Sequence, residues 1–561
     1  MPCCAQQHDK VGLARNNGPR EMIWGIVVPG FWRRSGFADR LAIGLLTGLC
    51  ILAIVVFRDY GISNDEEVQH RYGELIINYY ASGFRDVALF NYKNLYLYGG
   101  LFDIVAVLLA KLLPFDVFLI RHFLSAIIGV AGIVATWATA RLIAGPRAGL
   151  IAAVALATCG PYFGGMFNHT KDIPFAAAMI GALYFLLRAA RDFPAPRWRD
   201  VIGFGLMLGA ATGLRAMGLL LIGYAGLLVV IAVPWAERDI GKIGRYLGST
   251  GLRVAPAFVL GYLIMIAAWP WAALEPLNPL RAIFSFAHFH YEIRTIVAGE
   301  IYRMADVPRW YVPFYLLIKT PMLTSIGALC ALAFLIGAVA RDKIANLPRR
   351  QIEVAIVTFV VLFPIACEAA AQGPAFSGMR HFLFVVPPLA VLAGVGFDAV
   401  LMALSPQRWL AVFAACALSA AVVWNTVTLV RLHPYEYLFY NPLVGGLDGA
   451  ARRYEMDYWV NMMPDAVNAL QNYLGLPGDT SQRVYTVGVC GEKFSFDNYA
   501  DKRLRASPGW LEADFFIAPT HMNCDQLVEG RTVATIRRLG VPIGIVKDRR
   551  GITQRALGKA F

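Results

Sequence analysis

Residues 41–67 read LAIGLLTGLCILAIVVFRDYGISNDEE, a long apolar run followed by three consecutive carboxylates. The run Leu41–Phe57 is long enough for a helix that crosses most of a bilayer core of about 30 Å. Acidic side chains that crowd together between apolar runs are more typical of a reactive site than of anchoring. Asp65 is our candidate catalytic base, with Glu66 and Glu67 expected to raise its proton affinity. A solvated loop carboxylate is the simpler alternative.

Composition places the chain among membrane proteins. Of its 561 residues, 58% are hydrophobic and only 16% are charged, and the mean hydropathy is +0.54. Soluble domains have about a quarter of their residues charged. The first 37 residues are polar and basic and lack the apolar core of a signal peptide. We therefore expect a polytopic membrane protein with a cytoplasmic tail at residues 1–37.

The net charge of +13 does not indicate a nucleic-acid partner. Lys and Arg collect in short loops, as the positive-inside rule describes for cytoplasmic loops. Basic and aromatic residues do not alternate in a way that would follow a phosphate backbone.

Hydropathy predicts an α-helical bundle of about eleven transmembrane helices. The segment 97–113 is apolar but short, and counting it as a span would put most arginine clusters on the outer face. We therefore interpret 97–113 as an interfacial helix within the first outer loop, 58–117, with the tail inside and the C-terminus outside. The predicted spans of the 38–430 membrane domain are 38–57, 118–142, 147–167, 172–190, 201–214, 216–235, 252–274, 310–338, 352–371, 381–404 and 409–430.

The last 130 residues change in character and contain no apolar run of membrane length. The segments RVYTVGVC and ADFFIAPT are typical of buried strands. Helices are expected near 464–475 and 525–538. We expect a small periplasmic α/β domain at 431–561.

Two of the nine cysteines lie in this polar region. If the region faces an oxidising compartment, Cys490 and Cys524 are candidates for a disulfide. No Cys or His spacing matches a zinc site.

A second polar cluster, NHTKD (168–172), ends another apolar run on the same predicted face. Lys171 beside a helix N-terminus is typical of a phosphate site, because backbone N–H groups and the ammonium act together. Asp172 could instead only cap the helix, and His169 could hold a phosphate or a cation, or cap a helix.

Further cations lie near this face. Arg380 and His381 begin one span, Lys319 lies within another, and Arg215 lies between two short spans. Basic side chains at membrane depth need an anion or must extend to water. Lys171, Arg215, Lys319 and Arg380 are therefore candidates for neutralising a phosphate, although Arg215 could simply extend outward from a tight turn.

Several segments resemble the glycosyltransferase C superfamily, and its protein O-mannosyltransferase branch (glycosyltransferase family 39) most closely. They are the acidic pair after the first span, RHFLSAIIGVAGI, RLIAGPRAGLIAA, the KD pair before PFA, PRWYVPFYLLIKTP, GMRHFLFVVPPLAVLAG and YEYLFYNPLVGGLDGAARRYEMDYW. The resemblance implies that Asp65, with Glu66 beside it, is the catalytic base. It implies a second-loop role for Lys171 and Asp172, and donor phosphate binding by Arg380 and His381.

The resemblance also implies a sugar donor on a polyprenyl monophosphate, inversion at the anomeric carbon, and a bacterial inner-membrane enzyme with a periplasmic site and acceptor. Membrane lipids are expected partners. A cofactor is not established: Asp65, Glu66 and Asp172 could hold Mg²⁺ or Mn²⁺. The second loop has KD where the family has a richer acidic motif, which argues against a metal.

Two alternatives remain open at this point. A transporter or flippase of lipid-linked sugars would also carry charges within spans, but it predicts internal repeats that the sequence does not show. A glycan ligase or polymerase would use diphosphate-linked donors. The sequence identifies neither the sugar nor the acceptor.

Overall fold

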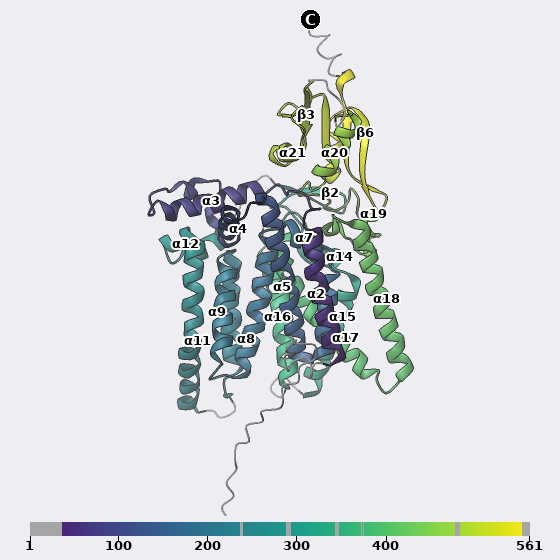
Figure 1. Ribbon diagram of the computed structural model, residues 1–561. Coiled ribbons are helices and arrows are strands. Elements are labelled where there is room, and N and C mark those ends of the chain that lie inside the picture. The colour runs from purple at the N-terminus through teal and green to yellow at the C-terminus, as the bar shows by residue number, and fades with distance from the viewer. Residues whose placement is uncertain are drawn as a thin grey trace, which may run out of the picture.

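The computed structural model describes residues 36–235, 239–287, 293–342, 347–371, 373, 375–476 and 483–552. The predicted tail, 1–37, lies outside this range except for its last two residues. The chain forms an upright helical bundle that carries a separate small sheet domain at one end (Figure 1).

Eight described helices are long and apolar enough to cross a membrane. They are α2 (Phe37–Val56), α5 (Val117–Ala144), α8 (Asp172–Arg191), α11 (Ile240–Ala268), α15 (Met322–Asp342), α16 (Arg349–Ala371), η6 with α17 (Arg380–Val385 and Val386–Ala403) and α18 (Arg408–Leu432).

The remaining predicted spans are helical but shorter or broken. A break between α6 (Pro146–Ala157) and α7 (Gly160–Asn168) bends this pair by 65°. The predicted short spans correspond to α9 (Trp198–Thr212) and α10 (Leu220–Ile231), and α14 (Tyr311–Lys319) precedes α15. The chain is thus a mostly helical polytopic membrane protein.

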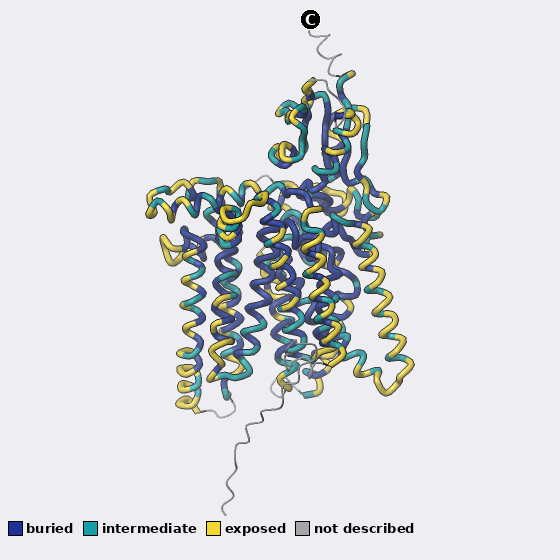
Figure 2. The backbone as a smooth tube through the Cα atoms, in the orientation of Figure 1, coloured by how far each residue is buried: buried dark blue, intermediate teal, exposed yellow. Residues whose placement is uncertain are grey.

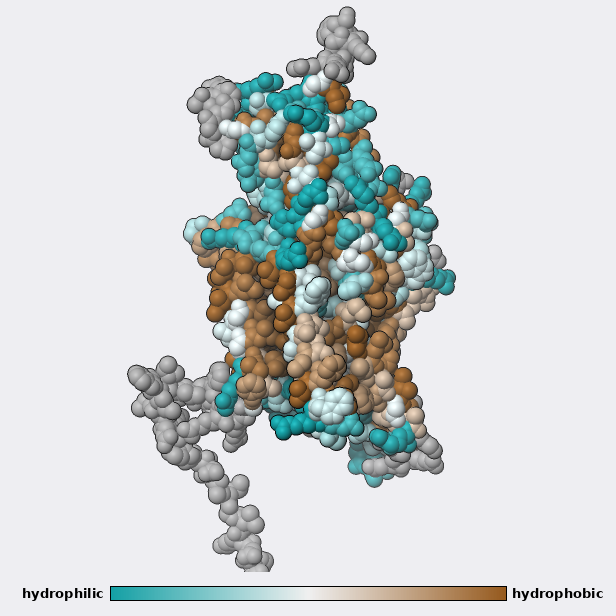
Figure 3. Space-filling view, turned by 90° about the vertical axis from the view of Figure 1, so that its right-hand side faces the viewer, coloured by the Kyte–Doolittle hydropathy of each residue, from teal (hydrophilic) through white to brown (hydrophobic). Residues whose placement is uncertain are grey.

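Burial separates the centre of the bundle from its periphery (Figure 2). Of an apolar stretch of 18 residues in α8, 78% is buried inside the protein, whereas only 6% of the corresponding stretch in α18 is buried. Figure 3 shows an apolar belt between two polar rims on the face that carries α18. Because exposed side chains in this belt are apolar, they suit lipid and not water.

At the end of the bundle far from the sheet domain, arginines pair with carboxylates of neighbouring spans. Arg141 Nε lies 2.7 Å from Asp39 Oδ1, and Arg147 Nε lies 2.7 Å from Asp398 Oδ1. The arginines that predicted the topology therefore lie at helix ends and also join neighbouring helices.

At the other end, α3 (Glu66–Ala81) lies across the bundle (Figure 1). It packs on α4 (Leu101–Leu112), which at 12 residues is too short to span a bilayer. Gly73 permits this contact, because a Cβ there would lie 2.7 Å from the Asp103 carbonyl oxygen.

The C-terminal domain has a five-stranded sheet in the order β4-β3-β5-β7-β6. Strands β3 (Tyr485–Val489) and β5 (Phe515–Pro519) are the two predicted strands, and α20 (Met463–Tyr473) is the first predicted helix. The other elements are α21 (Lys493–Tyr499), β4 (Leu504–Ser507), η9 (His521–Gln526), β6 (Arg531–Arg538) and β7 (Val541–Asp548). Cys490 and Cys524 form a disulfide.

The helix predicted at 525–538 is wrong. This segment ends η9 and then forms β6, which pairs antiparallel with β7. The sequence TVATI (532–536) is rich in β-branched residues, which favour strands over helices.

Candidate active site

Arg380 joins the two polar clusters that the sequence singled out. Its Nη2 donates a hydrogen bond of 2.9 Å to Asp65 Oδ2, and its Nε donates one of 3.0 Å to Asp172 Oδ2. Arg215 donates to the other oxygen of Asp172. Asp65 directly precedes α3 and Asp172 begins α8, where a carboxylate also interacts favourably with the helix dipole. Two carboxylates and two guanidinium groups therefore form one connected cluster.

Exposure distinguishes the members of this cluster. The Asp65 side chain is 47% exposed, whereas Arg380 is 10% and Asp172 only 3% exposed. Asp65 is thus the carboxylate of this cluster that a molecule could reach from water. Asp172 instead holds the two guanidinium groups in place.

The loops that carry these residues are tied together. Ser63 Oγ donates to the Asn168 carbonyl oxygen at 3.0 Å, and Asn168 Nδ2 donates to the Gly61 carbonyl oxygen at 3.1 Å. Gly61 lies so close to the C-terminal segment that a Cβ there would be 2.5 Å from the Asn461 carbonyl oxygen. The convergence of the acidic loop, NHTKD and Arg380 on one end of the bundle is confirmed.

Aromatic rings flank the cations, and sequence reasoning missed them. The Arg380 guanidinium lies 3.9 Å from the centre of the Trp459 ring, and Lys171 Nζ lies 4.3 Å from the centre of the Tyr98 ring. Trp459 is the last residue of the segment YEYLFYNPLVGGLDGAARRYEMDYW (435–459). In the sequence, only its place next to acidic and aromatic residues could have indicated a site residue. These contacts hold the cations without neutralising them.

Lys171 is buried next to the cluster. Burial lowers its pKa to about 8, with Asp103 acting to raise the pKa and Arg215 to lower it. Its ammonium is therefore charged at neutral pH but close to its titration point.

Lys319 and His169 lie deeper. Lys319 Nζ donates to the Tyr437 carbonyl oxygen at 2.9 Å and lies 3.9 Å from the centre of the Tyr440 ring. Both residues line a small cavity of about 20 Å³ that Arg380 also reaches. Burial lowers the pKa of His169 to about 4, so its imidazole is neutral. Lys319 is thus near the cluster but is not bonded to its carboxylates.

Glu66 does not face the same space as Asp65. It is 1% exposed, accepts hydrogen bonds from the Ser63 N–H and hydroxyl at 2.9 Å, and lies 3.1 Å from His122 Nε2. Burial raises the pKa of Glu66, but the charges of His122 and Arg121 outweigh burial and the net shift is downward. The prediction that the Glu66 carboxylate crowds Asp65 is therefore wrong, because Glu66 is bound to Ser63 and His122 instead. Arg121 and His122 were missed, although charges inside the apolar segment 118–142 were a signal.

An apolar cavity of about 290 Å³ ends at the cluster. Among the described lining residues, Arg215 and His381 supply basic groups and Glu368 supplies an acidic one. The apolar lining includes Tyr98, Met217, Ile283, Phe286, Phe376 and Phe382. The geometry suits a ligand with a long apolar part and an anionic end.

The candidate metal ligands each lie beside a basic side chain. Asp65 and Asp172 are paired with guanidinium groups, and Glu66 is paired with His122. Within the described ranges, no group of three or more His, Cys, Asp or Glu side chains is arranged to hold a metal ion. We therefore derive no step through a metal.

Comparisons with known proteins were made for sequence and for structure. A search of curated proteins found no match. ArnT from Cupriavidus metallidurans bound to undecaprenyl phosphate is 16% identical, with a TM-score of 0.46, over 90% of this chain and 97% of that chain. The Archaeoglobus fulgidus oligosaccharyltransferase in the apo form is 12% identical, with a TM-score of 0.47, over 87% of this chain and 70% of that chain.

One family model matches the chain. It is described as dolichyl-phosphate-mannose-protein mannosyltransferase, and it matches residues 101–265. This range runs from the start of α4 into the last turn of α11 and includes NHTKD and Arg215. The predicted resemblance to the protein O-mannosyltransferase branch is therefore confirmed over these residues.

Proposed function

We propose that this protein is a membrane glycosyltransferase that moves a sugar from a polyprenyl monophosphate to an acceptor at the membrane surface. One observation carries the proposal: an apolar cavity ends at a guanidinium cluster that also holds an accessible carboxylate. The cavity suits the isoprenoid, the cations suit the phosphate, and Asp65 suits an acceptor hydroxyl. The family match over residues 101–265 supports the same donor class.

The proposed donor phosphate lies between Arg215, Arg380 and Lys171. Arginines can bind phosphate oxygens through two parallel hydrogen bonds, and Lys171 adds a point charge. Since Arg215 already lines the cavity, a lipid phosphate can reach it without crossing the bundle.

The proposed reaction is a single displacement. An Asp65 carboxylate oxygen takes the proton of the acceptor hydroxyl, and the acceptor's oxygen attacks the anomeric carbon from the side opposite the phosphate. The bond between the anomeric carbon and the phosphate oxygen breaks, its electron pair stays on the polyprenyl phosphate, and the configuration inverts. Fixed cations stabilise the charge that develops on the leaving phosphate, a contribution of typically several kcal/mol.

The orientation is also part of the proposal. We place the N-terminus in the cytoplasm of a bacterial inner membrane, with the Asp65 cluster and the sheet domain on the periplasmic side. The arginines at the opposite helix ends favour this orientation under the positive-inside rule. The acceptor, whether lipid, glycan or protein, then arrives from the periplasm.

Two steps test the function. Purified protein is given polyprenyl monophosphate and polyprenyl diphosphate sugars, and transfer from the diphosphate alone would favour a ligase or polymerase. Mass spectrometry of envelope glycolipids and glycoproteins then compares a deletion strain complemented with wild type, Asp65→Asn or Glu67→Gln. We expect wild type and the exposed-site control Glu67→Gln to restore the missing glycoform and Asp65→Asn to fail at equal protein level. Full activity of Asp65→Asn would remove Asp65 from the mechanism.

A further inference from the structure

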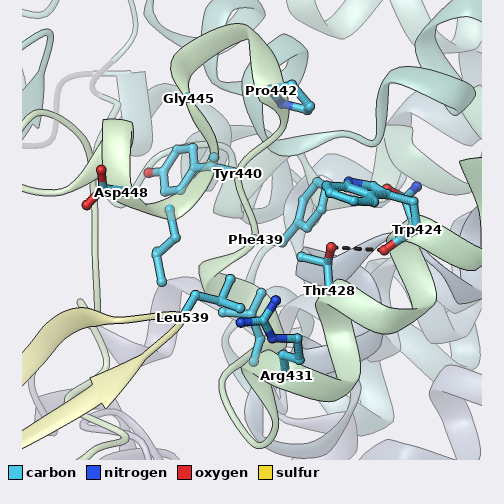
Figure 4. Close-up of a pocket in the computed structure, with 13 residues that line it drawn as sticks. Trp424, Thr428, Arg431, Phe439, Tyr440, Pro442, Gly445, Asp448 and Leu539 are labelled. Carbon is cyan, nitrogen blue, oxygen red and sulfur yellow. Dashed lines mark hydrogen bonds between the residues drawn. The ribbon is translucent and has the colours of Figure 1, made fainter.

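A second pocket lies well outside the cluster just described, at the junction of the last membrane helix and the sheet domain. Its volume is about 370 Å³. Figure 4 shows its walls, which come from α18, from the segment 439–448 and from Leu539 in the turn between β6 and β7. Three separate parts of the fold therefore build one pocket at the end of a lipid-exposed helix.

The wall of the pocket formed by α18 becomes more polar toward the C-terminal end of the helix. Trp424, Asn425, Thr428, Arg431 and Leu432 line the pocket, and their spacing puts them on one face. On neighbouring positions Val423, Val427 and Val430 are 60%, 50% and 71% exposed. A tryptophan one to two turns below an arginine is the pattern of a helix end that passes from the acyl region into the headgroup region.

Two polar side chains of this wall have no partner among the described residues. Asn425 is only 8% exposed, yet no hydrogen bond joins its amide to another group in the described part of the chain. Arg431 is exposed, and among the described residues no ion pair or hydrogen bond engages its guanidinium. Figure 4 shows Arg431 directed toward the middle of the pocket, beside Leu539. An amide that lines a pocket and bonds no described protein group can bind a ligand placed in that pocket.

We propose that this pocket binds the headgroup of an anionic phospholipid. Arg431 takes the phosphate and Asn425 donates a hydrogen bond to a phosphate or ester oxygen. The acyl chains follow the exposed valine face of α18, and the Trp424 ring lies at the level of the ester groups. Asp448 also lines the pocket and can accept from a headgroup hydroxyl. This inference does not depend on the proposed function or on the orientation of the membrane.

The bound lipid would join two parts of the fold. The β6–β7 turn that carries Leu539 is held near the end of α18, because Arg538 Nε donates to the His433 carbonyl oxygen at 3.0 Å. A lipid in the pocket contacts α18 and this turn together, so it would stabilise the sheet domain on the bundle.

Native mass spectrometry of the full-length protein tests the inference. The protein is exchanged into detergent with phosphatidylglycerol or phosphatidylcholine, with and without excess inorganic phosphate, and retained lipids are counted. Two pocket variants, Arg431→Gln and Asn425→Leu, are compared with Arg408→Gln, which removes an exposed arginine from the opposite end of the same helix.

We expect wild type and Arg408→Gln to retain one phosphatidylglycerol. Arg431→Gln should retain about fivefold less, as expected for loss of one lipid-facing cation, and Asn425→Leu should also retain less because it loses a hydrogen-bond donor to the lipid. The proposal would be overturned by equal retention in Arg431→Gln, by equal retention of phosphatidylcholine, or by displacement of the lipid by inorganic phosphate, which would indicate a free-phosphate site. Equal loss in Arg408→Gln would also overturn it, because retention would then follow net charge alone.

Discussion

The guanidinium of Arg380 lies 2.9 Å from the carboxylate of Asp65, although 315 positions separate them in the chain. The same guanidinium also bonds Asp172, so its position is fixed from two sides. Arg380 is therefore held between an accessible carboxylate and a buried one. This arrangement explains why a change at Arg380 should affect both ligand binding and folding.

Replacing Arg380 with Gln should weaken binding of undecaprenyl phosphate by at least about tenfold, since a hydrogen bond between charged groups contributes roughly 1.5–3 kcal/mol. The variant should also be less stable, because Asp172 keeps only Arg215 as a cationic partner. Tryptophan fluorescence titration and thermal unfolding measure the two effects. Arg303→Gln, an exposed arginine of β2 (Glu300–Arg303), is the control and should change neither. Unchanged binding by Arg380→Gln would exclude Arg380 from the phosphate site.

Binding of undecaprenyl phosphate should weaken as pH rises through about 8. The pKa of Lys171 is lowered to about 8 in the free protein, so the ammonium that attracts phosphate is lost above this pH. In Lys171→Arg the side chain stays charged in this range, and the dependence should flatten. A titration of Kd from pH 6.5 to 9.5 checks this. An identical alkaline loss in both proteins would assign the titration to another group.

Glu66→Gln should reduce stability more than it reduces donor binding. Breaking a buried ion pair typically costs about 3–5 kcal/mol, and Gln cannot neutralise the nearby Arg121 guanidinium. Because the pKa of Glu66 is lowered in the folded protein, its contribution is present above the unfolded pKa and is lost as pH falls through the folded value. The difference between the midpoint temperatures of thermal unfolding at pH 7 and at pH 4 should therefore be smaller in the variant than in wild type. The exposed-site variant Glu67→Gln should behave as wild type.

Much of this arrangement could be predicted from the sequence. Apolar runs and arginine positions predict the helices, because a bilayer imposes length and charge rules that are local in sequence. Asp65, Asp172, Arg215 and Arg380 were singled out as charged groups at the ends of apolar runs, and these four are the ones that touch.

The role of Glu66 could not be predicted in the same way. A helix that starts at residue 66 turns consecutive side chains by about 100°, so Asp65 and Glu66 face different surroundings. Nothing near Glu66 in sequence indicates that His122, 56 positions away, lies within hydrogen-bond distance of it. Trp459 is a similar case, since an aromatic ring reveals its cation only after the chain has folded.

Loss of the disulfide should destabilise the sheet domain and leave donor binding intact. The cystine closes a loop between residues 34 positions apart, for which chain entropy predicts roughly 3–4 kcal/mol. Cys490 directly follows β3 and Cys524 lies in η9, so the bond joins the end of a central strand to η9. We expect Cys524→Ser to lower the temperature at which proteolysis of the C-terminal domain begins. Binding of undecaprenyl phosphate should be unchanged. The control is Cys416→Ser, which replaces an exposed free cysteine of α18.

Thiol alkylation of membranes also reports the compartment, because a stable cystine requires an oxidising side. Free thiols at both positions in freshly prepared cells would contradict the cystine and the periplasmic placement of this domain together.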